Sequence, residues 1–248
     1  GRSGTRPSPR RSICRSKRPE QVGGERAVRK LIGAAFVSLD GVMQAPGAPE
    51  EDRTGGFALG GWLFNYFDEA VGTRIDTLFA GEFDLLLGRR TYDIFAAYWP
   101  FAQGENKALG ERFDRASKYV VTRGSQALPW RNSHRVADLD ALAGVRSGEG
   151  PPLLIQGSGT LYPQLLAAGL IDRLVLMTFP VILGSGKRLF GEGTPARSML
   201  MVDRQVTPGG NIVATYEPRG EVRPGSFATE EPSAAEMERR ERIRRGVW

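Results

Sequence analysis

Residues 153–179 have the sequence LLIQGSGTLYPQLLAAGLIDRLVLMTF, and this stretch decides the fold. The short apolar run 153–156 predicts a buried strand, and the Gly-Ser-Gly turn at 157–159 ends it. Residues 160–168 have the pattern of a helix, and 173–179 predict a second strand. A strand, a helix and another strand in succession indicate parallel pairing through a crossover helix. The segment therefore predicts an α/β fold.

The same alternation continues on both sides of this unit. Residues 31–39 form a continuous apolar run, which is typical of a strand buried on both faces. Pro208-Gly209-Gly210-Asn211 separates two further strands and predicts an antiparallel hairpin. The remaining expected elements are strands at 84–87, 118–121, 199–206 and 212–217, and helices at 66–80, 91–97, 107–116 and 139–145. We therefore expect a mostly parallel central sheet with flanking helices and a C-terminal antiparallel hairpin.

The charge of the chain predicts three regions. The formal net charge is +6, but residues 1–28 alone contain eight Lys or Arg and two Glu. This segment has very few large apolar side chains, so we expect a disordered basic tail. Residues 29–218 are nearly neutral and form the expected folded domain. Residues 219–248 are a charged tail, in which Ser233 and Glu236 have the spacing of a helix capping box.

Composition excludes several classes of protein. The single cysteine, Cys14, and the single histidine, His134, argue against disulfides and against a Cys/His metal site, so no metal is predicted. No run approaches the roughly 20 apolar residues that span a bilayer, and no secretory signal follows the basic N-terminus. We expect a cytoplasmic protein without a membrane partner. The neutral body also argues against nucleic acid as the ligand, although a basic tail can contact it.

Glycine and arginine residues follow three of the expected strands. Parallel sheets gather ligands at the carboxyl ends of their strands, and a glycine turn before a helix brings phosphate close to backbone amides. Each cluster alone is also explained by a tight turn, but three together favour a dinucleotide. Residues 184–188, Gly-Ser-Gly-Lys-Arg, look like the end of a P-loop but have Arg188 where Ser or Thr is needed. The clusters are Gly88-Arg89-Arg90-Thr91, Thr122-Arg123 and Gly157-Ser158-Gly159-Thr160.

Carboxylates and aromatic residues near the first strand are candidates for substrate contacts. Asp40 ends that strand, where it would bind or protonate a substrate, or would simply begin a turn with Gly41. Trp62 and Tyr66 would cover a flat heterocycle, with core packing as the alternative. Asp68 is a second candidate carboxylate, at the start of the expected helix 66–80.

Several motifs together resemble the dihydrofolate-reductase-like superfamily. More closely, residues 29–218 resemble the reductase domain of the bifunctional riboflavin-biosynthesis deaminase–reductase. Residues 180–190, Pro-Val-Ile-Leu-Gly-Ser-Gly-Lys-Arg-Leu-Phe, give the most specific match. The other matching motifs are Ser38-Leu39-Asp40-Gly41, Gly88-Arg89-Arg90-Thr91-Tyr92, Val121-Thr122-Arg123 and Gln156-Gly157-Ser158-Gly159-Thr160-Leu161.

The resemblance implies an NADPH-dependent reductase, often a homodimer, that transfers hydride to a small pterin-like or pyrimidine-like heterocycle. An arginine on the ribose 2′-phosphate would favour NADPH over NADH, and the long loop 41–61 would gate the site. Asp40 and Asp68 would be the catalytic residues; Ser38, Asp40, Trp62 and Tyr66 would contact substrate. The implied cofactor-binding residues are Ala35, Gly88, Arg89, Arg90, Thr91, Thr122, Arg123, Gly157, Ser158, Gly159, Thr160 and Leu161.

Two departures from the riboflavin enzymes leave the substrate open. Those enzymes carry a lysine in the first strand, where this chain has Ala34, and Glu-Gly-Gly where it has Gln156-Gly157-Ser158. The deaminase half has no counterpart in the sequence, since one cysteine cannot supply its zinc ligands. The alternative is therefore a non-catalytic nucleotide-binding or regulatory module of the same fold.

Overall fold

The computed structural model describes residue 1 and residues 28–247, and its centre is one eight-stranded sheet. The strand order is β4-β3-β2-β5-β1-β6-β8-β7, with β4 to β6 parallel and the β7–β8 hairpin antiparallel at one edge. The expected fold class is thus confirmed. The strands are β1 (Leu31–Ser38), β2 (Asp84–Gly88), β3 (Lys118–Val121), β4 (Ser133–Val136), β5 (Leu153–Gln156), β6 (Arg173–Phe179), β7 (Ser198–Val206) and β8 (Ile212–Gly220).

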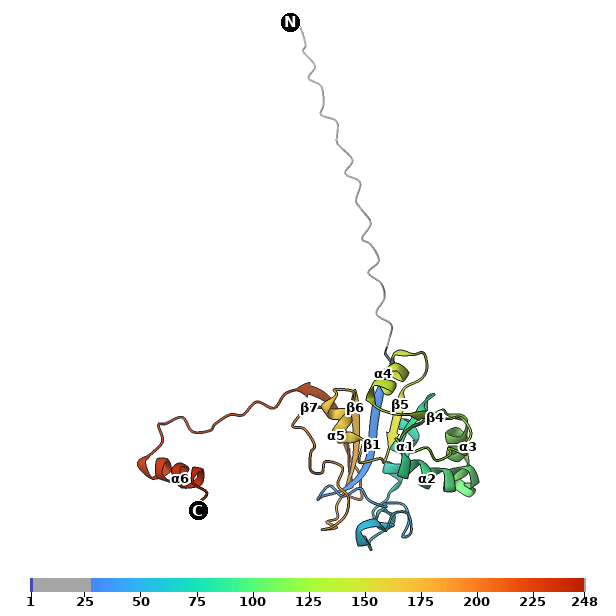
Figure 1. Ribbon diagram of the computed structural model, residues 1–248, viewed down its shortest axis with the longest axis horizontal. Helices are drawn as coiled ribbons and strands as arrows, with labels where there is room; N and C mark the ends of the chain where they lie inside the picture. The colour runs from blue at the N-terminus through green and yellow to red at the C-terminus, as the bar shows by residue number, and fades with distance from the viewer. Residues whose placement is uncertain (2–27, 248) are drawn as a thin grey trace.

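Helices cover both faces of the sheet (Figure 1). One face packs against α4 (Leu139–Ser147) and α5 (Tyr162–Ala167). The opposite face packs against α1 (Glu69–Leu78), α2 (Arg89–Tyr98) and α3 (Lys107–Arg115). Four short 3-10 turns complete the body, at Thr54–Gly56, Trp62–Asn65, Trp99–Phe101 and Gly104–Asn106.

The central strand β1 is buried on both faces because its side chains alternate between the two helical layers. Leu31, Ala35 and Val37 join the core under α4 and α5, whereas Ala34 joins the core under α1. Gly33 is required by close packing: a Cβ there would lie 2.7 Å from the Tyr162 ring. This glycine therefore lets α5 approach β1.

The edge strand β4 is absent from the sequence-based prediction, which has no element between the strand 118–121 and the helix 139–145. The error has a physical cause. β4 is short, and only Val136 of its four residues is buried, so the segment has little apolar pattern. His134 is exposed, and its ring lies 5.4 Å from the Tyr119 ring on the neighbouring strand.

Two helices also begin later than predicted. The helix expected at 66–80 starts at Glu69, because the Asp68 side chain caps its N-terminus by accepting from the Val71 amide. The helix expected at 160–168 starts at Tyr162, with Pro163 in its first turn. Both shifts leave polar residues in the turns at the carboxyl edge of the sheet.

The long loop 41–61 is packed against the body along much of its length. Val42, Ala45 and Phe57 are buried in the core beside α1. Val42 pairs with Arg188 in an antiparallel bridge, and the Met43 amide donates to the Lys187 carbonyl at 2.9 Å. The start of the loop is therefore paired along the segment 187–188.

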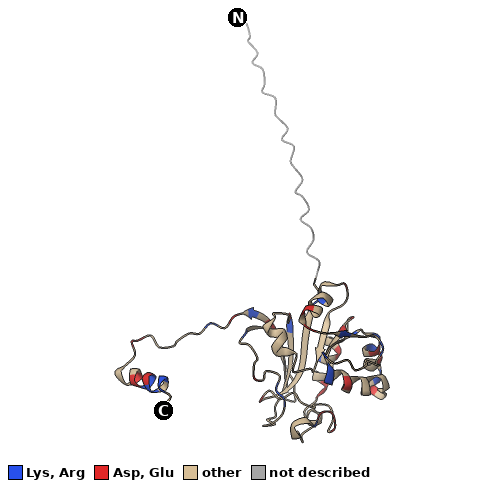
Figure 2. Ribbon diagram, in the orientation of Figure 1, with Lys and Arg blue, Asp and Glu red and all other residues tan. Residues whose placement is uncertain are grey.

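Helix α6 (Ala234–Arg244) lies away from the sheet, with alternating basic and acidic side chains (Figure 2). Ser233 caps it by accepting from the Glu236 amide at 3.3 Å, and none of its residues is buried. Residues 2–27 of the expected basic tail lie outside the described residues. Among the residues that the structure describes, no helix is long and apolar enough to cross a membrane.

Candidate functional site at the carboxyl edge of the sheet

Two of the predicted phosphate-binding turns are fastened together by hydrogen bonds at the carboxyl ends of β2 and β5. The Gly88 amide donates to Ser158 Oγ at 2.8 Å, and the Ser158 amide donates to Thr91 Oγ1 at 3.0 Å. Ser158 is buried and has a φ of 59°, in the left-handed region. This reciprocal pair fixes the turn after β5 against the first turn of α2.

Glycine residues in the β5 turn allow close approach of two other segments. A Cβ at Gly157, where φ is 71°, would lie 3.3 Å from Thr91 Cγ2. At Gly159, a Cβ would lie 2.8 Å from Met43 Sδ. Met43 of the long loop therefore covers this turn, so the loop and the β5 turn share one surface.

The arginines that follow β2 and β3 differ in how they are engaged. Arg89 donates to Asp93 at 3.0 Å and to the carbonyls of Gln126 and Ala127 at 3.2 Å, which ties α2 to the segment after β3. Arg90 is 57% exposed in its side chain and lies 4.0 Å from Asp52. Arg123 is exposed, and within the described residues its side chain has no hydrogen bond or ion pair.

Other predicted cofactor residues lie in the same turns or beneath them. Thr122 Oγ1 accepts from the Gly124 amide at 3.1 Å, and Thr160 is exposed. Leu161 and Ala35 are buried in the core, so these two side chains support the turns from below. Gln156 ends β5, and its buried Oε1 has no hydrogen-bond partner among the described residues.

Asp40 is bound to the segment after β6. Its carboxylate accepts from Ser38 Oγ at 2.6 Å and from the Leu183 and Gly184 amides at 3.1 and 2.9 Å. The Ser38 hydrogen bond, followed by these amides, lowers the pKa of Asp40 to about 2. Ser38 itself is buried and also accepts from the Val42 amide. Asp40 is therefore ionised at neutral pH and orders the 183–184 turn.

Asp68 fastens the start of α1 to the β7–β8 turn. One oxygen accepts from the Val71 amide, and the other accepts from Thr207 Oγ1 at 2.5 Å and Asn211 Nδ2 at 3.0 Å. Burial raises the pKa of Asp68, but these hydrogen bonds outweigh burial and leave the pKa below its usual value. Asp40 and Asp68 thus contact different segments, and both are held ionised.

The two predicted substrate-covering aromatics take different positions. Trp62 is 7% exposed, donates from Nε1 to the Gln44 carbonyl at 2.9 Å, and lies edge-on to Phe179. Tyr66 is half-buried, and its carbonyl accepts from Asn211 Nδ2 at 2.8 Å. Trp62 therefore supports the long loop from the core side, whereas Tyr66 keeps part of its surface accessible.

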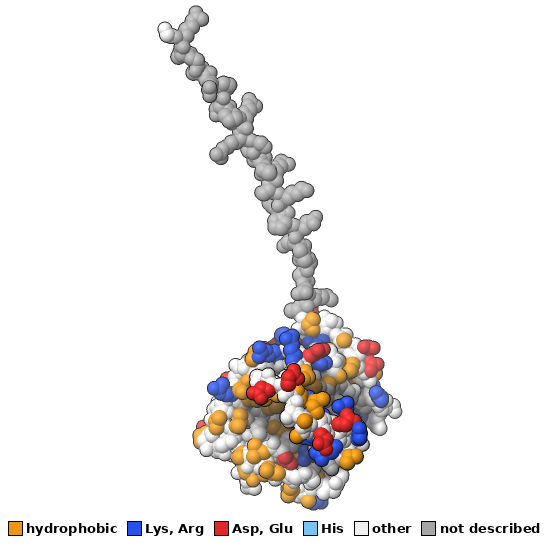
Figure 3. All heavy atoms as spheres, turned by 90° about the vertical axis from the view of Figure 1, so that its left-hand side faces the viewer, with side chains coloured by type: hydrophobic (Ala, Val, Ile, Leu, Met, Phe, Trp, Pro, Cys, Tyr) orange, Lys and Arg blue, Asp and Glu red, His pale blue; other side chains and the backbone are white. Residues whose placement is uncertain are grey.

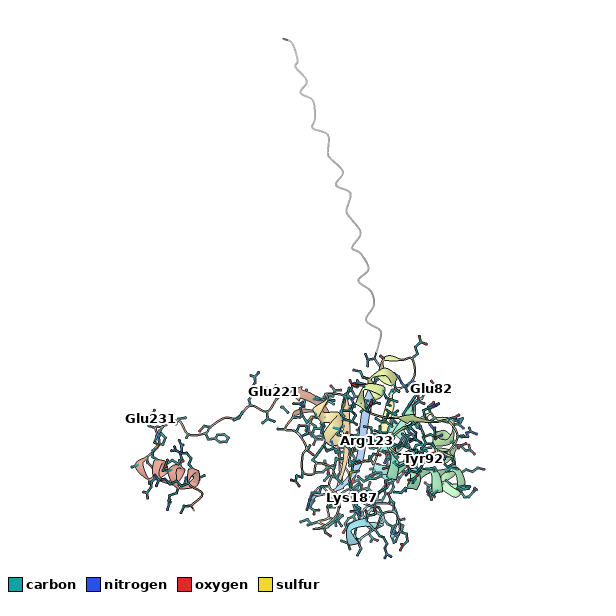
Figure 4. All side chains as sticks on the ribbon, in the orientation of Figure 1. Glu82, Tyr92, Arg123, Lys187, Glu221 and Glu231 are labelled. Atoms are coloured by element: carbon teal, nitrogen blue, oxygen red, sulfur yellow. The ribbon has the colours of Figure 1, made fainter. Side chains whose placement is uncertain are left out.

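Sequence reasoning missed a cleft of about 420 Å³ between the long loop and residues 185–187. Two basic side chains, Arg90 and Lys187, line the cleft. The label of Lys187 in Figure 4 shows that the cleft lies at the lower end of the sheet in that view. The glycine-rich segment 184–188 was the one sequence feature that could have indicated this cleft. Its likeness to the end of a P-loop gave no indication that it pairs with the long loop. The cleft is lined by Gln44, Thr54, Gly55, Phe57, Arg90, Ser185, Gly186 and Lys187.

Comparison with protein-family models identifies the relationship. Residues 29–214 match the model described as the RibD C-terminal domain. The chain belongs to the RibD C-terminal domain family. This confirms the resemblance to the riboflavin-biosynthesis reductase domain, and the family relationship accounts for the reductase-like α/β fold.

The chain is similar in sequence to a curated protein and in fold to several solved structures. An uncharacterised protein, YyaP, of Bacillus subtilis (strain 168) is 26% identical over 152 residues, 58% of this chain and 79% of that protein. A putative riboflavin biosynthesis protein from Shewanella sp. PV-4 has a TM-score of 0.58 at 21% identity, over 77% of this chain and 99% of that one.

Two further solved structures are similar at lower identity. A pyrimidine reductase-like protein from Corynebacterium diphtheriae has a TM-score of 0.51 at 15% identity, covering 79% of this chain and 93% of that one. Dihydrofolate reductase from Enterococcus faecalis, complexed with NADP(H) and RAB-propyl, has a TM-score of 0.50 at 13% identity, over 77% and 96%. At these identities the likeness shows the fold alone.

Proposed function

We propose that this RibD C-terminal domain protein is an NADPH-dependent oxidoreductase that transfers hydride to a small pterin-like or pyrimidine-like heterocycle. The observation that supports this most is the fastened pair of turns, Gly88–Thr91 and Gly157–Ser158, beside the exposed Arg90 and Arg123. A rigid glycine turn, a helix N-terminus and exposed guanidinium groups are what a dinucleotide phosphate requires.

The residues at this edge fit a dinucleotide. The first-turn amides of α2 lack intrahelical partners, as at any helix N-terminus, and attract an anion. Arg90 would contact the diphosphate, and Arg123, after β3, would pair with the 2′-phosphate of NADPH. Arg89 would act indirectly, because its bonds to Asp93 and to the Gln126 and Ala127 carbonyls hold the segment after β3 in place.

The proton for reduction would come from ordered water. The cofactor supplies the hydride when bound; the protein orients the partners and excludes bulk water. Asp40 and Asp68 are both held ionised, so neither is a proton donor at neutral pH. Asp40 would orient the water through the remaining lone pair of Oδ2, which also faces Arg188 at 3.6 Å, and Tyr66 would cover the heterocycle.

We further propose that the protein is a cytoplasmic homodimer. Strand β7 of the β7–β8 hairpin is the last strand of the sheet. It exposes Leu200, Met201 and Val202, each of which is about 45–46% accessible. Such an apolar edge is more stable when a second copy covers it. Figure 3 views the molecule from the side on which β7 and α6 lie, and hydrophobic, basic and acidic side chains are interspersed over that face. Sedimentation giving only monomer at micromolar concentration would contradict the dimer.

The alternative is a nucleotide-binding module without catalysis. Ala34 and Gln156 favour it, because they replace a lysine and a glutamate of the riboflavin enzymes. NADPH binding without NADPH oxidation across a panel of pterins and pyrimidines would support this alternative over the reductase.

The test is a fluorescence titration with NADPH and with NADH on the parent protein, Arg90→Ala and Arg123→Ala. We expect NADPH to bind more tightly than NADH, and Arg123→Ala to weaken NADPH binding about tenfold while leaving NADH nearly unchanged. Arg90→Ala should weaken both nucleotides. Arg173→Ala is the matched control, because Arg173 begins β6 and pairs with Glu217 at the amino ends of the parallel strands, away from the proposed site.

Failure of both nucleotides to bind the parent protein would contradict the proposal. Equal weakening of NADH and NADPH by Arg123→Ala would contradict the assignment of the 2′-phosphate site while leaving cofactor binding in place.

A further inference from the structure

Asp52 of the long loop is bound by two cations that also line the cleft. Lys187 Nζ lies 2.5 Å from Asp52 Oδ2, and Arg90 Nη1 lies 4.0 Å from the same oxygen. The Asp52 side chain is only 10% exposed, whereas Arg90 and Lys187 keep 57% and 39% of theirs. One protein carboxylate therefore lies where the anionic group of a ligand would meet both cations.

Asp52 belongs to a short strap, residues 52–54, that Gln44 and Lys187 hold against the body. Gln44 Nε2 donates to the Asp52 and Thr54 carbonyls at 3.0 and 2.9 Å, and Gln44 Oε1 accepts from the Lys187 amide at 2.9 Å. Thr54 also donates to Asp52 Oδ1 at 2.5 Å. The strap is thus held to the body by the hydrogen bonds of Gln44 and by one ion pair, between Lys187 and Asp52.

The loop beside the strap is closed on itself. The Glu51 carboxylate accepts from the Gly47 and Ala48 amides at 2.7 and 3.3 Å. Residues 47–51 thus form a hydrogen-bonded unit that adjoins the strap. Arg53, whose side chain is 64% exposed, is the only Lys or Arg between Lys30 and Arg74 and so offers trypsin one cleavage site in this region.

We propose that Asp52 is an internal anion that holds the strap in place until a phosphate or carboxylate group of a ligand displaces it from Arg90 and Lys187. The inference rests on the proposed function only in that NADPH or an anionic substrate would supply this group. Because ligand and Asp52 compete for the same two cations, ligand binding and release of the strap are coupled. Loading the site therefore opens the loop beside it.

The experiment measures trypsin cleavage after Arg53 by mass spectrometry, with inorganic pyrophosphate and with NADPH as separate probes. It compares the parent protein with Asp52→Asn, Lys187→Gln and the remote control Arg173→Gln. Each unfolded variant gives its intrinsic cleavage rate, which corrects for the Asn beside Arg53. A parallel titration measures the affinity for each anion.

In the parent protein, an effective anion should accelerate cleavage at Arg53 severalfold. Asp52→Asn should be cleaved rapidly without anion and should bind the anion about tenfold more tightly, because the competing carboxylate is gone. Lys187→Gln should also be cleaved rapidly but should bind the anion more weakly. Arg173→Gln should match the parent protein in both measurements.

The two probes separate this inference from the proposed function. Acceleration by pyrophosphate without any binding of NADPH would support the internal anion and contradict the reductase. NADPH binding with unchanged cleavage and no gain in Asp52→Asn would leave the reductase standing and overturn the internal anion. If neither anion binds the parent protein or Asp52→Asn, the internal anion is also overturned.

Discussion

Selected arginines at the two ends of the parallel strands differ in burial and in ion pairing. At the amino ends of the strands, Arg29 is 3% exposed in its side chain and lies 2.5 Å from Asp84. Arg146, 12% exposed, lies 2.8 Å from Asp172 at the same edge. At the carboxyl ends, Arg90 is 57% exposed and has only a 4.0 Å contact with Asp52, and Arg123 is exposed.

This difference separates charges that stabilise the fold from charges that are available to a ligand. A buried arginine with a matched carboxylate cannot bind an anion without leaving an uncompensated charge. An exposed arginine at a helix N-terminus has no such cost. The buried pairs at the amino edge therefore stabilise the fold, and the exposed arginines at the carboxyl edge are the ones that the proposed function assigns to a ligand.

The largest expected effect comes from breaking the buried pair at the amino edge. Arg29→Ala leaves the Asp84 carboxylate with the Ser117 amide as its remaining partner. We expect the free energy of unfolding to fall by about 3–5 kcal/mol, as for other buried pairs that lose one partner. Denaturant titration measures it. Arg173→Ala, which breaks the exposed pair with Glu217, should cost no more than about 1 kcal/mol. Equal losses in the two variants would contradict the comparison.

An intermediate effect is expected from the hydroxyl that fastens the two turns at the carboxyl edge. Ser158→Ala removes the acceptor of the buried Gly88 amide, which should cost about 1–3 kcal/mol. Ser158→Gly loses the same hydroxyl but relieves the backbone at φ 59°, so it should be about 1 kcal/mol less costly. Thermal unfolding measures both. If Ser158→Gly were the more damaging, the left-handed backbone would not be the source of the difference.

A smaller effect is expected from pH. Because hydrogen bonds lower the pKa of Asp40 from 3.8 to about 2 in the folded state, its contribution is complete above pH 4. That contribution is lost as the pH falls from about 4 towards 2, where the unfolded state binds the proton first. Asp40→Asn should flatten the dependence of Tm on pH in this window. An unchanged slope would show that Asp40 is not held ionised by Ser38 and the 183–184 turn.

The sequence predicted the parallel body well because buried strands have a strong apolar pattern. The runs at 31–39 and 84–87 correspond to β1 and β2, and the Gly-Ser-Gly turn at 157–159 lies between β5 and α5. Strand β4 could not be found in this way, since an exposed edge strand needs little apolar pattern. The start of α1 was misplaced because the predicted helix included Asp68, whereas the Asp68 side chain caps the helix by accepting from the Val71 amide.

The candidate site was predictable in its turns but not in its contacts. Glycine after a strand predicts a turn at the carboxyl edge, and residues 88–91 and 157–160 do lie where β2 meets α2 and where β5 turns towards α5. Which arginine is exposed depends on partners far away in sequence, such as the Gln126 carbonyl that engages Arg89. The cleft beside Lys187 needs the pairing of the long loop with residues 185–189, and no local pattern encodes that pairing.

The most direct test of the binding edge is amide hydrogen exchange of the intact protein with and without saturating NADPH. Exchange at the carboxyl edge should slow in residues 88–91, 122–124 and 157–161, while the amino-edge segments around Arg29 and Asp172 stay unchanged. Slowing at the amino edge instead, or no slowing anywhere at saturating NADPH, would contradict the claim that the carboxyl edge holds a dinucleotide.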